Sequence, residues 1–342
     1  MTDVIRVLVV DDSAYVRKVI RQMLSRSPFL EVVGTARDGR EALERAAELK
    51  PDVITCDLIM PSLDGVGFIR EQMTRRPIPI VIVSVASESG ELVLAALDAG
   101  AVDFVQKPTA LASDRVLEIA DELIEKVKAA SKSHPASIRE APLLATQRTA
   151  AAHVVDIVVI GISTGGPQAL KMLIPRLPAE LAVPIAIVLH MPVGYTELYA
   201  RKLNEQSALT VLEAQGGEVV TAGHVYIAPA GRHLTFRRNP AGQVVTYLDV
   251  RPLDTPYRPS VDTLFQSAAD TYGARVLGIV MTGMGSDGRE GAAWIKAKGG
   301  MVLTESEASC VVYGMPRSIV EAGLSDGEVL LDRMADAVLA RV

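Results

Sequence analysis

Short runs of branched apolar residues alternate with amphipathic stretches through the first 128 residues of the chain. The first run, residues 6–10, stops at a polar segment, 11–13, whose Asp and Ser side chains are typical helix caps. The following stretch, 16–24, repeats its apolar residues at about the 3.6-residue period of a helix. Further strand-like runs and helical faces cover 30–35, 42–47, 52–56, 80–85 and 116–127. Five such repeats in about 125 residues predict a doubly wound parallel sheet.

The alternation restarts after residue 153 with longer elements. Strand-like runs are found at 157–162, 185–189 and 276–281. Residues 224–229, 234–238 and 244–248 are interpreted as a hairpin region, with Asn239-Pro240-Ala241-Gly242 as its turn. The second half is therefore predicted to be a doubly wound, mostly parallel sheet with an antiparallel hairpin portion.

Residues 129–153 interrupt the pattern between the two halves. They are rich in Ala and Ser, contain Pro135 and Pro142, and lack a sustained apolar stripe. Such composition is typical of a semi-flexible linker. We therefore predict an α/β protein with a flavodoxin-like (βα)5 domain at 1–128, a linker at 129–153 and a second domain at 154–342. A length of 342 residues fits two domains.

Composition indicates aliphatic cores and a reducing compartment. Hydrophobic residues make up 49% of the chain and aromatic residues only 4%, which is ordinary for parallel sheets covered by helices. No apolar run reaches the length of a membrane span, and the N-terminus lacks a signal-peptide pattern. Only two cysteines, Cys56 and Cys310, are present. We expect a cytoplasmic protein without membrane insertion.

The charge balance argues against a nucleic-acid partner. The net charge is −6, with 16 basic and 21 acidic residues in 1–128 and 16 basic and 19 acidic residues in 154–342. Neither half has the basic excess that nucleic-acid-binding domains show. No helix-turn-helix pattern follows the linker, so a transcriptional regulator is disfavoured.

An acidic pocket is predicted in the first half. Asp11, Asp12 and Asp57 follow strand-like runs, and three converging carboxylates favour a hard, oxygen-ligated cation such as Mg²⁺. Ser84 and Lys107 end two further strands and can bind phosphate oxygens. Singly, each residue is more often a cap or a loop residue. Their joint occurrence at strand ends predicts a phosphoryl-transfer site in which Asp57 is the nucleophile.

The second half carries a different set of residues. Ser163 lies in a Gly-x-Ser-x-Gly turn, and His190 and Asp287 follow two other apolar runs. If the three strands are neighbours, these side chains meet at one edge of the sheet as nucleophile, base and orienting acid. Backbone N–H groups from Thr164 onward can stabilise an oxyanion. The order Ser, His, Asp differs from that of the α/β-hydrolases and indicates another family of serine hydrolases.

A glycine-rich turn between strand and helix can also hold a phosphate. Here the segment 161–166 lacks the second glycine of the dinucleotide fingerprint, and no Lys-Ser/Thr completes a P-loop. A lone histidine after a buried strand is more often structural than catalytic, and Asp287 alone could be a turn residue. The hydrolase interpretation depends on all three occurring together.

The first half resembles a response-regulator receiver domain. The resemblance is carried by Asp11-Asp12-Ser13, Asp57-Leu58-Ile59-Met60-Pro61-Ser62-Leu63-Asp64-Gly65, Ser84 and Gly100-Ala101-Val102-Asp103-Phe104-Val105-Gln106-Lys107-Pro108. It implies phosphorylation of Asp57 by a partner histidine kinase. It also implies Mg²⁺ ligated by Asp11, Asp12, Asp57 and the backbone carbonyl of Ile59. Ser84 and Phe104 match the hydroxyl–aromatic switch pair of that family.

The second half resembles the chemotaxis protein-glutamate methylesterases, which join a receiver to a catalytic domain. The matching segments are Gly161-Ile162-Ser163-Thr164-Gly165-Gly166-Pro167, His190-Met191-Pro192, Ala228-Pro229, Arg258-Pro259-Ser260-Val261-Asp262, Thr282-Gly283-Met284-Gly285-Ser286-Asp287-Gly288 and Ser309-Cys310-Val311-Val312-Tyr313-Gly314-Met315-Pro316. One departure is Leu189, where the family commonly has Gln; a drier site is expected there.

The resemblance implies hydrolysis of glutamyl methyl esters on chemoreceptor helices, with release of methanol and often deamidation of glutamines as well. It implies that Ser163 is the nucleophile, His190 the base and then the acid, and Asp287 the orienting group. Thr164 and Met284 would contribute around the oxyanion. No cofactor is implied for this half.

We further expect the unphosphorylated receiver to cover the Ser163 edge, and phosphorylation of Asp57 to weaken that cover through Ser84 and Phe104. The competing hypothesis is a catalytically silent adaptor that acts as a phosphate sink or signalling partner. The presence of Ser163, His190 and Asp287 argues against it. A monomer is the expected oligomeric state.

Overall fold

The computed structural model describes residues 4–85, 90–107, 113–133 and 155–342. The chain divides into two compact units, Met1–Ile138 and Arg139–Val342, each of which is described by itself. Across the described ranges no helix combines the length and the apolar character needed to cross a membrane.

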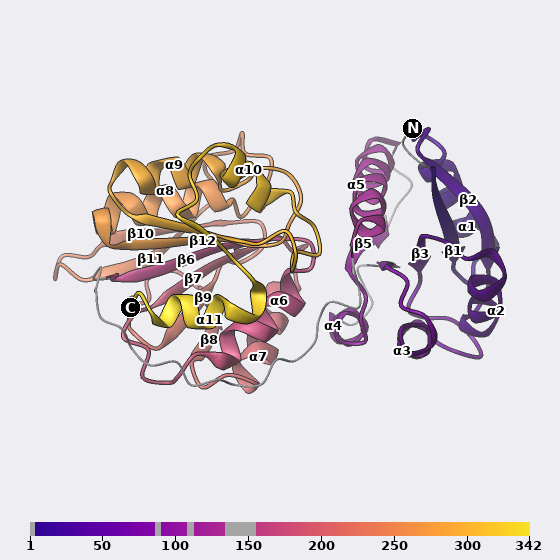
Figure 1. Cartoon of the computed structure of the whole chain (residues 1–342), viewed down its shortest axis with the longest axis horizontal. Coiled ribbons are helices and arrows are strands. Elements are labelled where there is room, and N and C mark those ends of the chain that lie inside the picture. The colour runs from indigo at the N-terminus through magenta and orange to yellow at the C-terminus, as the bar shows by residue number, and fades with distance from the viewer. Residues whose placement is uncertain (1–3, 86–89, 108–112, 134–154) are drawn as a thin grey trace. The chain divides into compact units, whose positions relative to one another are not determined.

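The first unit is a five-stranded parallel sheet with helices on both faces (Figure 1). Its strands are β1 (Ile5–Val10), β2 (Leu30–Ala36), β3 (Val53–Cys56), β4 (Ile80–Val85) and β5 (Asp103–Lys107). Its helices are α1 (Ala14–Leu24), α2 (Gly39–Leu49), α3 (Gly65–Arg75), α4 (Gly90–Asp98) and α5 (Ser113–Ser131). The strand order β2-β1-β3-β4-β5 confirms the predicted flavodoxin-like arrangement.

Polar side chains start three of these helices. Ser13, Asp38 and Asp64 accept hydrogen bonds from backbone N–H groups in the first turns of α1, α2 and α3. The last helix, α5, ends at Ser131, later than the boundary of 128 expected from the sequence. Ala129 and Ala130 are buried, which explains why the helix continues through them. Most of the predicted linker, 134–153, lies outside the described residues.

The second unit contains a seven-stranded, entirely parallel sheet in the order β14-β13-β12-β6-β7-β9-β8, and a separate antiparallel pair, β10-β11. The strands are β6 (Ile157–Ile162), β7 (Ile185–Leu189), β8 (Thr210–Glu213), β9 (His224–Ile227), β10 (His233–Arg238), β11 (Val244–Asp249), β12 (Val276–Val280), β13 (Met301–Glu305) and β14 (Gly327–Val329). The helices are α6 (Gly166–Leu173), η1 (Ile174–Arg176), α7 (Thr196–Glu205), α8 (Val261–Tyr272), η2 (Gly273–Arg275), α9 (Arg289–Ala297), α10 (Met315–Glu321) and α11 (Leu331–Leu339).

The hairpin prediction is confirmed for two of its three segments. Strands β10 and β11 pair antiparallel around the turn at 239–242, in which Gly242 N–H donates to the Asn239 carbonyl. The third segment was predicted wrongly, because β9 pairs in parallel with β7 and β8 inside the main sheet. Its residues Val225, Tyr226 and Ile227 are buried on both faces, a pattern that cannot distinguish a central strand from a hairpin strand.

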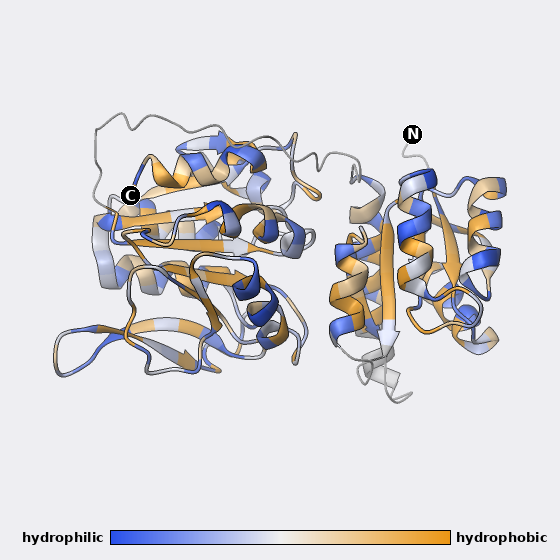
Figure 2. Ribbon diagram, turned by 90° about the horizontal axis from the view of Figure 1, so that it is seen from below, coloured by the Kyte–Doolittle hydropathy of each residue, from blue (hydrophilic) through white to orange (hydrophobic). Residues whose placement is uncertain are grey.

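The main sheet lies between α8, α9 and α10 on one face and α6, α7 and α11 on the other (Figure 1). Its strands are hydrophobic, while the helices carry hydrophilic outer faces (Figure 2). The chain starts in the middle at β6, extends to β7 and β9 on one side and then returns to β12 on the other. The carboxyl ends of β6 and β12 therefore flank a topological switch point, where open α/β sheets bind ligands.

Gly161, within β6, brings α8 close to that switch point. A Cβ on Gly161 would lie 2.3 Å from Cγ1 of Val261, the first residue of α8. Any side chain here would push the start of α8 away from the sheet. The N-terminus of α8 is thus held beside the end of β6.

Candidate active site

Ser163 follows β6 and opens the turn into α6. Its N–H donates to the Thr282 carbonyl at 3.0 Å, and its carbonyl accepts from Gly166 N–H at 2.7 Å. The residue of the turn with left-handed backbone is Gly165, with φ of 79°. A Cβ on Gly165 would lie only 2.6 Å from that of Val311, so glycine is required for backbone and space alike. The turn presents Ser163 at the carboxyl end of the sheet.

The loop after β12 packs directly on this turn. A Cβ on Gly283 would lie 2.8 Å from the Cβ of Ser163. The buried Thr282 hydroxyl donates to the Thr164 carbonyl at 2.9 Å and accepts from Val312 N–H at 2.9 Å. The Thr282 hydroxyl therefore connects the turn that contains Ser163 with the segment that contains Val312.

The buried carboxyl group of Glu305 binds the backbone of Thr282. Glu305 accepts from the Thr282 N–H at 2.9 Å and from the Ser309 hydroxyl at 3.0 Å. It is fully buried, and this burial raises its pKa to about 7 although the two donors lower it. Glu305 thus fixes the loop after β12, and the sequence analysis did not identify it.

His190 follows β7, and its N–H donates to the Ile162 carbonyl at 3.1 Å, which places it beside Ser163. Its Nε2 lies 2.9 Å from Oδ2 of Asp287. A carboxylate accepts, so this contact assigns a proton to Nε2, and in the neutral imidazole Nδ1 then carries the lone pair. Nδ1 is buried and has no hydrogen-bond partner among the described residues. The structure thus joins His190 and Asp287 by their side chains, and Ser163 to His190 through the adjacent strand ends.

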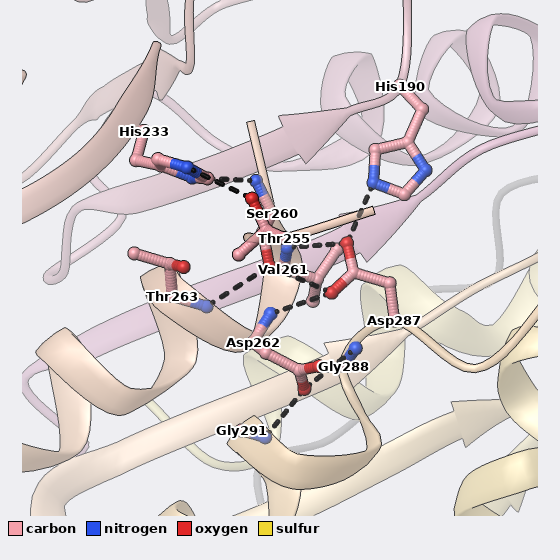
Figure 3. Close-up of polar contacts among 10 residues, drawn as sticks. All are labelled: His190, His233, Thr255, Ser260, Val261, Asp262, Thr263, Asp287, Gly288 and Gly291. Carbon is pink, nitrogen blue, oxygen red and sulfur yellow. Dashed lines mark hydrogen bonds and ion pairs between the residues drawn. The ribbon is translucent and has the colours of Figure 1, made fainter. Parts of the chain in front are cut away.

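Asp287 is held at the N-terminus of α8 (Figure 3). It accepts from the Ser260 hydroxyl at 3.0 Å and from the N–H groups of Val261 at 2.8 Å and Asp262 at 3.0 Å. Burial alone would raise its pKa, but the bond and charge of His190 and these N–H groups lower it below the usual value. Asp287 is therefore a fixed, charged partner for the imidazole.

Asp262 makes the reciprocal contact. Its Oδ1 accepts from Gly288 N–H at 2.9 Å and Gly291 N–H at 2.7 Å, at the start of α9 (Figure 3). Burial, with the nearby Asp287 charge, raises its pKa to about 6. Each of the two helices is thus capped by an aspartate from the segment that begins the other.

Two residues that sequence reasoning left without a role complete this region. The ring of Tyr257 stacks on His190, with centroids 4.3 Å apart and planes 14° apart. His233 is fully buried and bonds both Ser260 and Pro252. The motif at 258–262 could have pointed to Ser260 and Asp262, whereas no sequence signal marked Tyr257 or His233.

The two predicted oxyanion residues lie beside Ser163. Thr164 is buried in the same turn, and Met284 is half-buried and follows Gly283 in the contacting loop.

The first unit gathers its acidic residues at the carboxyl ends of β1 and β3. Oxygen atoms of Asp11, Asp12 and Asp57 all lie within 4.8 Å of one another. Lys107 Nζ lies 2.7 Å from Asp11 and 2.7 Å from Asp57. Burial opposes the charge of Lys107, but these two carboxylates outweigh it and raise its pKa. For Asp11 burial is the largest influence, and it raises the pKa of this carboxyl above its usual value. A cluster of hard oxygen donors with a compensating cation fits a divalent metal.

The remaining predicted residues of this unit lie on β4, on β5 and in the loop after β3. Ser84 and Phe104 are buried on the neighbouring strands β4 and β5, and Ile59 exposes 54% of its surface just after Asp57. Lys126 of α5 donates to the Phe104 carbonyl at 2.6 Å, a link that the sequence did not indicate.

Comparison with known proteins assigns both units. A family model described as CheB methylesterase matches residues 158–338, and a response regulator receiver domain model matches residues 7–121. The chain belongs to the CheB methylesterase family. A protein-glutamate methylesterase/protein-glutamine glutaminase of Myxococcus xanthus is 51% identical over 338 residues, covering 96% of each chain.

Further members of the CheB family are similar to the whole chain or to its second unit. A protein-glutamate methylesterase/protein-glutamine glutaminase of Thermotoga maritima is 44% identical and covers 95% of each chain. The crystal structure of the Thermotoga maritima CheB methylesterase catalytic domain is 42% identical, with a TM-score of 0.53, and covers 54% of this chain and 97% of that one. The combination of receiver and methylesterase domains is thereby established.

Proposed function

We propose that this chain is a phosphorylation-regulated hydrolase that removes methyl groups from glutamyl methyl esters on chemoreceptor helices, releases methanol, and also deamidates glutamines there. The names of its relatives support both activities. The observation that carries the proposal is the His190–Asp287 bond of 2.9 Å, whose acceptor is fixed by the N-terminus of α8.

In the proposed mechanism Ser163 Oγ attacks the acyl carbon while His190 Nδ1 takes the hydroxyl proton. Asp287 holds the imidazole through Nε2 and stabilises its charged form. The N-terminus of α6, with Thr164 and Met284 beside Ser163, favours the negative charge of the tetrahedral intermediate. His190 then protonates the leaving methoxide or amide, which departs as methanol or ammonia. Water attacks the acyl-enzyme by the same route and leaves a glutamate.

The first unit would receive the signal. Asp57 is proposed as the phosphorylated residue, with a histidine kinase as the phosphodonor. Asp11, Asp12, Asp57 and the Ile59 carbonyl would hold Mg²⁺, which screens charge during phosphoryl transfer. Lys107 would contact the phosphoryl group, and Ser84 and Phe104 would respond to it.

We further propose that the unphosphorylated receiver restricts access to Ser163, and that phosphorylation relieves this. A linker of about 25 residues keeps the local concentration of one domain near the other at roughly millimolar. Weak binding is then sufficient for inhibition, and a modest change at the receiver can release it.

The decisive experiment is methanol release from methylated receptor helices, with and without a small-molecule phosphodonor. Wild-type protein should release methanol faster with the donor, and Asp57→Ala should not respond to it. Ser163→Ala and His190→Ala should nearly abolish turnover, and Asp287→Asn should reduce it by up to about 10⁴-fold.

A serine-directed fluorophosphonate probe provides the control. It should label wild type and Asp57→Ala but not Ser163→Ala, whereas Ser286→Ala, an exposed serine next to Asp287, should be labelled normally. Full turnover in the Ser163, His190 and Asp287 variants would remove the triad. A protein without any methanol release would support the silent adaptor.

A further inference from the structure

His233 has an environment that permits only one state of its ring. It is fully buried at the start of β10. Its Nδ1 lies 3.2 Å from the backbone nitrogen of Ser260 (Figure 3). Its Nε2 lies 3.1 Å from the carbonyl oxygen of Pro252. A backbone N–H can only donate and a carbonyl can only accept, so Nδ1 must carry the lone pair and Nε2 the proton. Only the neutral Nε2–H tautomer satisfies both contacts.

Each contact leads to one side of the candidate active site. Ser260 is the N-cap of α8, and its hydroxyl donates to Asp287. Pro252 begins the segment 252–259, which carries Tyr257 onto the face of the His190 ring. These contacts, together with the chain between Pro252 and Tyr257, form a closed circuit that runs from His233 through Ser260, Asp287, His190 and Tyr257 and back to His233.

We propose that His233 is a positioning residue for the His190–Asp287 pair: through Nδ1 it fixes the helix start that binds Asp287, and through Nε2 it fixes the segment that places Tyr257 on His190. The contribution of His233 to turnover rests on the proposed function, whereas its effect on the geometry of the pair does not.

The surroundings of His233 keep its ring neutral. Burial is the largest influence and lowers its pKa, and the positive charge of Arg258 acts in the same direction. The Pro252 carbonyl and the negative charges of Asp287 and Asp249 oppose this without reversing it. A protonated ring would point Nδ1–H at the Ser260 N–H, so the circuit is expected to open only in acid.

Two substitutions separate the two bonds. His233→Asn keeps an acceptor near the position of Nδ1 and loses the Nε2 donor, so the Tyr257 segment should loosen while Asp287 stays in place. His233→Gln keeps a donor near Nε2 and loses the Nδ1 acceptor, so the start of α8 should loosen instead. His224→Asn is the matched control, because the side chain of His224 hydrogen-bonds Thr221 and Ala222 and its ring stacks on Tyr226, none of which contacts the His190–Asp287 pair.

The test uses full-length protein and two readouts. The first is the NMR signal of the His190 ring, whose Cε1–H senses the ring current of Tyr257; Tyr257→Leu defines the shift when stacking is lost. His233→Asn should move this signal toward the Tyr257→Leu position, and His233→Gln should leave it at the wild-type position. The second is methanol release, in which His233→Gln should lower kcat by about tenfold to a hundredfold with little change in KM.

Equal effects of Asn and Gln on kcat, with the His190 signal of both at its wild-type position, would overturn the proposal and leave His233 as a core residue. Wild-type kcat and signal in both variants would also overturn it. If wild type releases no methanol, the proposed function fails, but the NMR comparison still decides the role of His233.

Discussion

Glu305 combines complete burial with a carboxyl group that can ionise near neutral pH. Its pKa rises from an ordinary 4.5 to about 7 in the folded chain. The folded state therefore binds the proton more tightly than the unfolded state does. The resulting stability is fully present below pH 4.5 and is lost as the pH rises through about 7.

Glu305→Gln should remove this pH dependence. Glutamine has the shape of the protonated acid and can accept from Thr282 N–H while donating to Ser309. Urea unfolding should show wild type losing about 2–3 kcal/mol of free energy of unfolding between pH 5 and pH 8.5 relative to the variant. Glu307→Gln, at an exposed site two residues away, should follow wild type. Parallel curves for Glu305→Gln and wild type would show that the carboxyl stays ionised when buried.

Single residues also show which parts of the candidate site can be predicted from the sequence and which cannot. Ser163, His190 and Asp287 could be found because each follows an apolar run, and the parallel sheet brings strand ends together. Tyr257 and His233 could not be found, because their contacts depend on how the loop 250–259 folds back. Glu305 has the additional difficulty that a glutamate at a strand end is ordinarily exposed.

At the scale of elements, α8 and α9 are joined by exchanged caps. Asp287 lies just before α9 and binds the N-terminus of α8, while Asp262 lies in α8 and binds the N-terminus of α9. Negative charge at a helix N-terminus is favourable, and here it lies at the N-termini of both α8 and α9. Since Asp287 also binds His190, this exchange connects helix packing to the candidate active site.

Asp262→Ala should therefore destabilise the second unit by about 1–2 kcal/mol, because two N–H groups of α9 lose their acceptor. Asp262→Asn should be as stable as wild type at pH 7.5, since Oδ1 remains and the repulsion of Asp287 is removed. Chemical denaturation of both variants provides the measurement. If the Asn variant lost as much free energy of unfolding as the Ala variant, the negative charge of Asp262, and not its hydrogen-bond acceptor, would stabilise α9.

Most elements were predictable from apolar periodicity, and the exceptions have physical causes. The prediction of a hairpin region that includes residues 224–229 fails for β9, because parallel pairing with β7 and β8 buries this strand on both faces. Helix α5 ends at Ser131, beyond the domain boundary predicted at 128, and its residues Ala129 and Ala130 are buried although they show no apolar stripe. In both cases the structure depends on contacts between residues that are far apart in the sequence.

At the scale of the whole molecule, the proposal is that a tethered receiver inhibits the esterase. Removing residues 1–150 should then raise kcat/KM for receptor helices above that of the unphosphorylated full chain. Asp57→Ala in the full chain should keep the low activity with or without a phosphodonor. An unchanged kcat/KM after the deletion would contradict inhibition by the receiver.

The tether also makes a quantitative prediction about separated parts. If the linker supplies a roughly millimolar local concentration, the inhibitory contact itself can be weak, with a dissociation constant well above about 10 μM. A receiver fragment, residues 1–133, mixed at about 10 μM with a fragment of residues 155–342 should therefore leave esterase activity nearly unchanged. Methanol release during titration of the receiver fragment toward about 1 mM should then fall. Full inhibition at equimolar micromolar concentration would show instead that the interface is strong by itself, and phosphorylation would have to overcome several kcal/mol of binding instead of a marginal contact.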